Sequence, residues 1–262
     1  MSSSTERVVR DVVFDTRPGF RPLSLDLHLP AADGAPVIVF VHGGGWRVGS
    51  RRMFCPTFAV EDGFPRLTAA GFAVASVDYR LSGEAVFPAP LDDVTAALTW
   101  VRARGADHGI DPARIVMWGE SAGAHLAALA GLTDGPGVRG VVDWYGPSDL
   151  LAFPAPRADE ERPTREEALI GGIVAERPEA ARLASPALRV HAGAPPFHIA
   201  HGTADDAVPF AQSEELHAAL VAAGVDAELL RVPGAGHMWR GLEDPDAVLS
   251  PALAFARRVV GA

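Results

Sequence analysis

The sequence has little of three things: cysteine, basic charge and long apolar runs. It contains one cysteine, Cys55, so no disulfide can form within the chain. Its 23 Lys and Arg residues are outnumbered by 33 Asp and Glu residues, which gives a formal net charge of −10. This balance argues against a nucleic-acid-binding surface and against docking on anionic membranes, because both need clustered basic side chains.

Other absences narrow the function further. No apolar run reaches the ~18 residues of a transmembrane helix, and the first thirty residues contain no secretory signal. No phosphate-binding glycine motif follows a strand candidate, so nucleotide binding has no support. With 262 residues and 48% hydrophobic residues, the chain can build one large core. We expect a cytoplasmic protein with one domain over 1–262, active as a monomer or homodimer.

Short apolar runs alternate with helical patterns along the chain. The first two runs alternate apolar and polar residues, and the central ones are almost continuously apolar, as in strands buried on both faces. The expected strands are 8–14, 23–29, 37–41, 72–77, 114–118, 139–145, 197–201 and 228–232. The expected helices are 91–105, 121–132, 209–224 and 246–262. The alternation predicts an α/β fold with a mostly parallel eight-stranded sheet flanked by helices.

One segment, residues 149–196, interrupts the alternation. It is rich in proline and charge, and it is too long for a simple connection between a strand and a helix. We expect a small, partly helical, cap-like insertion over the strand ends. Its charged run RADEERPTREE (157–167) is expected to form a solvated face.

Four unusual segments directly follow strand candidates: HGGGW (42–46), GESAG (119–123), GTADDAVP (202–209) and PGAGHMW (233–239). Because ligands bind at the carboxyl ends of strands in open α/β sheets, these segments should meet at one edge. GESAG matches G-x-S-x-G, in which a serine sits on a strained turn between a strand and a helix. Taken alone, each segment could also be an ordinary glycine-rich turn.

Three residues in these segments fit nucleophilic catalysis. Ser121 is a weak nucleophile without a base in reach, and His237 is the best candidate for that base. A carboxylate must orient the imidazole, and Asp205 is preferred over its neighbour Asp206.

Backbone amides that could hold a negatively charged oxygen are expected from Gly44, Gly45 and Ala122. Glycine suits this loop because it lets the backbone approach a substrate closely. Trp46 and Trp239 lie beside the same loops in the sequence and are the expected substrate-binding side chains.

The remaining histidines have simpler interpretations. His42 is expected to brace the glycine loop rather than act as a second base. His125, on a helix, and His198 and His201, on a strand, are expected to be core or surface residues. His198 and His201 have no cysteine or carboxylate at metal-ligand spacing, so no zinc site is expected. The chemistry outlined above needs no metal and no organic cofactor.

With these residues identified, the sequence resembles the α/β-hydrolase superfamily, and within it the carboxylesterase branch near hormone-sensitive-lipase-like and feruloyl-esterase-like members. The order Ser, Asp, His is the order of that superfamily. The resemblance rests on LDLHLP, VHGGGW, VDYRLSGEAVFPAPLDDV, DPARIVMWGESAG, YGPSDL and HGTADDAVPFAQSEELHAAL. It implies oxyanion amides at Gly44 and Gly45, a nucleophile at Ser121, and a triad completed by Asp205 and His237.

The resemblance implies a serine carboxylesterase that acts on small-molecule esters, short-chain or aryl, through an acyl-enzyme. Only about forty residues precede the glycine loop, too few for the N-terminal helical cap of hormone-sensitive-lipase-like enzymes, so an open site for short acyl groups is expected. Three alternatives stay open. They are an arylformamidase, amide hydrolase or peptidase-like hydrolase, a non-hydrolytic biosynthetic acyl-transfer enzyme, and a ligand-binding protein without turnover.

Overall fold

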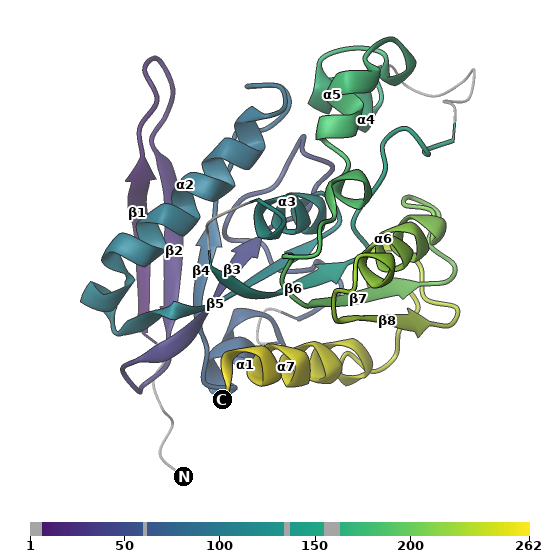
Figure 1. Cartoon of the computed structure of the whole chain (residues 1–262). Helices are drawn as coiled ribbons and strands as arrows, with labels where there is room; N and C mark the ends of the chain where they lie inside the picture. Colours follow the sequence, from purple (N-terminus) through teal and green to yellow (C-terminus); the bar gives the residue numbers. More distant parts are fainter. Residues whose placement is uncertain (1–6, 60–61, 134–136, 155–162) are drawn as a thin grey trace.

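A computed structural model describes residues 7–59, 62–133, 137–154 and 163–262 (Figure 1). Its centre is an eight-stranded sheet in the order β1-β2-β4-β3-β5-β6-β7-β8. The strands are β1 (Arg7–Asp15), β2 (Leu23–Leu29), β3 (Ala35–Val41), β4 (Ala73–Val77), β5 (Ile110–Glu120), β6 (Val138–Trp144), β7 (Phe197–Gly202) and β8 (Ala227–Val232). The β1–β2 and β2–β4 pairs are antiparallel, and all other neighbours are parallel. The predicted α/β class and mostly parallel sheet are confirmed.

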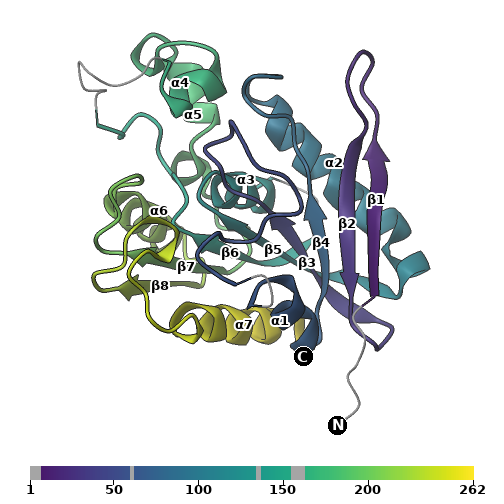
Figure 2. The same ribbon diagram turned by 180° about the vertical axis from the view of Figure 1, so that it is seen from behind.

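Helices cover both faces of the sheet (Figures 1 and 2). One face carries α2 (Ala89–Arg104), α3 (Ala122–Gly131) and α6 (Ala211–Ala222), and the other carries α1 (Phe64–Ala69) and α7 (Asp246–Val260). Alternate residues of β3 therefore enter two different cores: Val37, Val39 and Val41 face α2 and α3, whereas Ile38 and Phe40 face α1 and α7. Side chains of a strand alternate between faces, which explains why the central strands are continuously apolar.

Every expected strand and helix overlaps an observed one, and the structure adds short elements. The helix α1 follows a glycine and has proline at its start. In the 149–196 segment lie α4 (Arg165–Ile170), α5 (Pro178–Leu183) and the 3₁₀ turns Val174–Glu176 and Pro186–Arg189. Two further 3₁₀ turns are Gly105–His108 and His237–Trp239. Within the parts of the chain that the structure describes, no helix is both long and apolar enough to cross a bilayer.

The charged run 157–167 differs from its expected solvated face. Residues 157–162 lie outside the described residues. Thr164 and Glu167 are buried, and they form a capping box at the start of α4. The Glu167 amide donates to the Thr164 hydroxyl over 3.2 Å, and the Thr164 amide donates to the Glu167 carboxylate over 2.9 Å. For these two residues the expectation was wrong, although their T-x-x-E spacing is the sequence signature of such a cap.

Candidate active site

The tight turn between β5 and α3 carries Ser121. Its backbone lies at φ 51° and ψ −123°, a conformation that non-glycine residues rarely adopt. Gly119 and Gly123 are both required because a larger residue at either position would clash with the backbone. A Cβ on Gly119 would collide with the backbone of Gly123, and a Cβ on Gly123 would collide with the carbonyl of Val41. The sequence G-x-S-x-G therefore folds as a strained corner that raises the serine at the end of the strand.

Ser121, His237 and Asp205 form a continuous hydrogen-bonded chain. The Ser121 hydroxyl lies 3.0 Å from His237 Nε2, and His237 Nδ1 lies 2.7 Å from Asp205 Oδ2. The other carboxylate oxygen, Oδ1, accepts from the amides of Ala207 and Val208 over 2.8 Å each. The three side chains come from the ends of β5, β7 and β8, so the parallel sheet brings together residues 116 positions apart.

The protonation states follow from these contacts. Burial raises the pKa of Asp205, but hydrogen bonds from His201 and His237 outweigh burial and hold that pKa well below its usual range. Asp205 is therefore an anion, and the His237 nitrogen that faces it must carry a hydrogen. The other nitrogen, Nε2, is left with a lone pair directed at the Ser121 hydroxyl. This is the arrangement in which imidazole can remove a proton from serine.

The loop after β3 presents free backbone amides beside the serine. Gly44 and Gly45 have φ angles of 108° and 59°, which favour glycine. The amides of Gly44, Gly45 and Ala122 donate no hydrogen bond to any residue that the structure describes. They are thus available to a ligand.

His42 sits under this loop as a brace. Its ring is stacked on Tyr79 with 4.4 Å between centroids, and its Nδ1 donates to the Gly43 carbonyl over 2.7 Å. Burial lowers the pKa of His42 to about 4, so the ring is neutral near pH 7. A Cβ on Gly49 would collide with this ring, which explains why glycine also stands at position 49, after the three glycines at 43–45.

A buried carboxylate that the sequence analysis missed lies next to the serine. Glu120 accepts from the Tyr145 hydroxyl over 2.9 Å and from the Gly43 amide over 3.4 Å. Burial raises the pKa of Glu120, and the hydrogen bonds from Tyr145 and Gly43 oppose that rise. Its position inside GESAG was visible in the sequence, but its partners come from two other strand ends. Glu120 therefore ties the glycine loop to the serine turn.

The structure corrects the expectation for the two tryptophans. Trp239 is 0% exposed and packs between Trp144 and Tyr145 in the core under α7, so its side chain does not face the site. Trp46 is 1% exposed, and its Nε1 donates to His125 Nδ1 over 3.2 Å. An indole held in the core supports the glycine loop from below rather than lining an open pocket.

The 149–196 segment contacts the same loop. His125 Nε2 donates to the carbonyl of Ala184 over 2.6 Å, which connects Trp46 to the end of α5. The Arg47 side chain donates to the Pro163 carbonyl. Arg165 lies against Gly45, where its Cδ would be 2.7 Å from a Cβ on that glycine. The segment therefore packs on the loop that carries the free amides, and His125 is a core residue, as expected.

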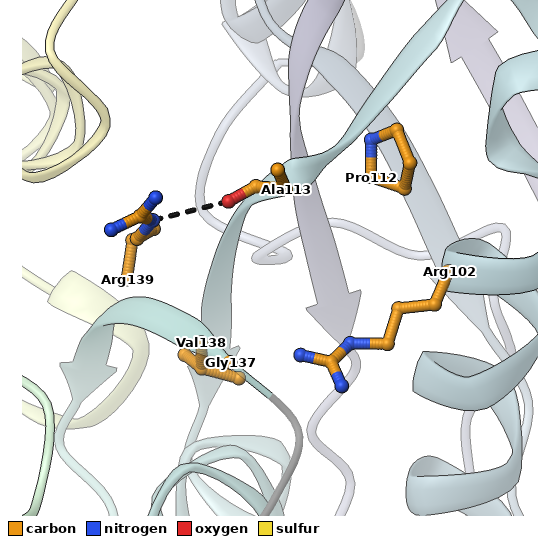
Figure 3. Close-up of a pocket in the computed structure, with 6 residues that line it drawn as sticks. All are labelled: Arg102, Pro112, Ala113, Gly137, Val138 and Arg139. Carbon is orange, nitrogen blue, oxygen red and sulfur yellow. Dashed lines mark hydrogen bonds between the residues drawn. The ribbon is translucent and has the colours of Figure 1, made fainter.

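A separate hollow of about 480 Å³ lies between α2 and the first residues of β5 and β6 (Figure 3). It is lined at the start of β5 and β6 by Pro112, Ala113, Val138 and Arg139, and Arg139 donates to the Ala113 carbonyl over 3.1 Å. Because β5 and β6 are parallel and Ser121 follows the end of β5, the hollow is remote from the triad. It plays no part in the site.

The chain is similar to known esterases in sequence and in structure. The BD-FAE family matches residues 25–220. Esterase LipQ of Mycobacterium tuberculosis is 35% identical over 239 residues, which cover 84% of this chain and 55% of LipQ. A truncated carbohydrate esterase from gut microbiota superposes with a TM-score of 0.85 at 30% identity, covering 100% of this chain and 99% of that one.

An esterase of Thermogutta terrifontis with butyrate bound has a TM-score of 0.71 at 26% identity, covering 97% of this chain and 92% of the other. In contrast to these structures, the chain spans only about half the length of curated relatives such as LipQ.

Proposed function

Since this chain belongs to the BD-FAE family of α/β-hydrolases, we propose that it is a serine carboxylesterase that hydrolyses short-chain or aryl carboxylic esters. The observation that carries the proposal is the buried chain of hydrogen bonds from Ser121 through His237 to Asp205. A nucleophile, its base and an orienting carboxylate in this geometry are what acyl transfer requires.

In the first half of the reaction, Ser121 Oγ attacks the ester carbonyl carbon while its proton passes to His237 Nε2. Asp205 stabilises the imidazolium that forms. The carbonyl oxygen becomes negative, and the amides of Gly44, Gly45 and Ala122 donate to it. The C–O bond to the alcohol then breaks, and the alcohol leaves with the proton held by His237.

In the second half, a water molecule attacks the acyl-serine. His237 removes a proton from the water, the same amides hold the second oxyanion, and the acid leaves as Ser121 regains its proton. The free enzyme is thus restored without any other reactant. Glu120 and His42 act indirectly, by holding the glycine loop beside the serine.

Short acyl groups are favoured by the packing of the 149–196 segment on the glycine loop, where Arg165 lies against Gly45. The butyrate bound to the Thermogutta terrifontis esterase supports the same range. A strong preference for acyl chains longer than about ten carbons would contradict this part of the proposal, because such chains need a long apolar groove.

The test compares hydrolysis of p-nitrophenyl acetate, butyrate and octanoate and of N-formylkynurenine by the wild type, Ser121→Ala and the control Ser250→Ala. Ser250 is an exposed serine on α7. We expect rapid turnover of the short esters, a loss of about 10⁴-fold or more in Ser121→Ala, and no change in Ser250→Ala. Preference for the formamide would indicate an amide hydrolase instead. No turnover by folded wild type would refute esterase function.

A further inference from the structure

A second histidine contacts the carboxylate of the triad. His201 Nε2 lies 3.1 Å from Asp205 Oδ2, the same oxygen that lies 2.7 Å from His237 Nδ1. The side chains of His201 and Asp205 are both 0% exposed. His201 is the next-to-last residue of β7, and Asp205 follows in the loop, so the end of one strand supplies both.

The surroundings of His201 fix which nitrogen carries its hydrogen. Nε2 faces two acceptors, Asp205 Oδ2 and the Val208 carbonyl, which lies 3.1 Å away. Two acceptors require a donor between them, so Nε2 is protonated. In neutral His201 the other nitrogen, Nδ1, then accepts from the Ser213 hydroxyl over 2.7 Å. The ring is therefore held from both sides, by the loop and by α6.

We propose that His201 is a positioning residue of the triad. Its Nε2–H keeps Asp205 Oδ2 directed at His237, and it withdraws part of the negative charge of that oxygen. The inference rests on the proposed function, because it assigns a role in tuning the base that activates Ser121. Removing a donor from a shared acceptor leaves more charge for the remaining donor.

Loss of the His201 hydrogen bond should make His237 easier to protonate. Without His201, Asp205 would stabilise protonated His237 more strongly, and the base would be lost to protonation at a higher pH. The low pKa of Asp205, held down by His201 and His237 against burial, is consistent with this sharing.

Other titratable groups lie close to the rings of His201 and His237. The Tyr145 ring lies 5.0 Å from the ring of His237, and Glu120 is close enough for His237 to lower its pKa. Asp143, on β6, is close enough for His201 to act on its pKa. His201→Phe and His201→Gln both lack the imidazole that acts on Asp143, so a difference between the pH profiles of these two variants reports the hydrogen bond to Asp205.

The test measures kcat/KM for p-nitrophenyl butyrate against pH in the wild type, His201→Phe, His201→Gln and the control His198→Phe. His198 is a buried histidine on the same strand that contacts a carboxylate, Glu228, outside the triad. Glutamine can donate from its amide nitrogen to Asp205, whereas phenylalanine cannot.

We expect the acid limb of His201→Phe to move up by about half a pH unit, as the loss of one hydrogen bond to a shared charge implies, and kcat to fall about tenfold. The His201→Gln variant should restore the wild-type limb, and His198→Phe should leave it unchanged. The proposal would be overturned if the acid limb of the kcat/KM profile is unshifted in folded His201→Phe, or if it shifts equally in His198→Phe.

A second measurement needs neither a variant nor activity. In ¹⁵N-histidine NMR spectra of the wild type, His201 should carry a hydrogen on Nε2, the nitrogen that faces Asp205 and the Val208 carbonyl. A hydrogen on Nδ1 alone would overturn the inference even if His201→Phe does not fold. Absence of esterase turnover in the wild type would instead refute the proposed function, so the two failures are distinguishable.

Discussion

His237 Nδ1 and Asp205 Oδ2 are 2.7 Å apart, while the neighbouring carboxylate of Asp206 turns outward to an exposed ion pair with Arg240. The pair of adjacent aspartates thus divides into one buried partner of the imidazole and one surface residue. Asp205→Asn should lower kcat by about 10⁴-fold, because the amide no longer holds His237 in the tautomer that accepts the serine proton. Asp206→Asn is the matched control and should stay within about twofold, as expected for an exposed pair. If esterase assays show the larger loss of kcat in Asp206→Asn, then Asp206, and not Asp205, orients the imidazole.

The serine turn should be intolerant of a single methyl group at Gly119. A Cβ there would meet the backbone of Gly123, which cannot move without shifting α3. We expect Gly119→Ala to lose about 3 kcal/mol of unfolding free energy in urea titrations and, where folded, about 100-fold in kcat. Gly83→Ala is the control, since a Cβ on Gly83 meets nothing within 4 Å. Equal losses of unfolding free energy and of kcat in the two variants would show that the turn tolerates a Cβ at position 119.

Asp143 gives the protein a measurable pH dependence of stability. Burial raises the pKa of Asp143 from 3.8 to about 6, and its Oδ2 has no hydrogen-bond partner among the described residues. The folded state therefore holds a proton that the unfolded state has already released, and stability falls as the pH rises from about 4 to about 6. Asp143→Asn removes this titration. The free energy of unfolding of the variant relative to wild type should rise by about 3 kcal/mol between about pH 4 and pH 7.

Urea unfolding at several pH values measures that difference. The wild type supplies the reference at each pH, so titrations of other groups cancel. A variant whose stability runs parallel to that of the wild type across this range would mean that Asp143 does not titrate there.

Trp46 is expected to act through stability rather than through substrate contact. Trp46→Phe removes the donor to His125 Nδ1 and leaves a buried acceptor unpaired, which should cost about 1–3 kcal/mol of unfolding free energy. Trp118→Phe is the control, because Trp118 is equally buried and its Nε1 meets no acceptor in the described part of the chain. The KM of Trp46→Phe for p-nitrophenyl acetate should stay within about twofold of wild type. A large rise in KM at unchanged stability would restore Trp46 as a substrate contact.

Most of the helices and strands could be predicted from local patterns in the sequence. The continuous apolar run 37–41 and the helical pattern of 91–105 each correspond to an observed element. A strand buried on both faces is apolar throughout, whereas a helix buried on one face has apolar residues at every third or fourth position. The sheet order, in which β4 lies between β2 and β3, leaves no such pattern, since it depends on packing between distant segments. The short helix α1 is too brief for a period to be recognised.

The candidate site was also predictable only where local sequence patterns mark its residues. Ser121, Asp205 and His237 were identified because each lies in a glycine-rich segment at a strand end, and parallel strands bring those ends together. His201 and Glu120 were missed, as their roles depend on partners from other strands and loops. The tryptophans were misplaced because sequence neighbourhood does not reveal on which side of a loop a side chain packs.

The most direct test of the account is covalent trapping of the nucleophile. A fluorophosphonate should react with the wild type by forming one P–O bond to Ser121 and releasing fluoride. Among the hydroxyl groups in the described part of the chain, only that of Ser121 hydrogen-bonds to the base His237. Peptide mass spectrometry should find one adduct per chain, on Ser121, that appears as esterase activity disappears and is absent from Ser121→Ala. An adduct on another residue that accompanies inactivation, or labelling of Ser121 that leaves activity intact, would contradict the central claim.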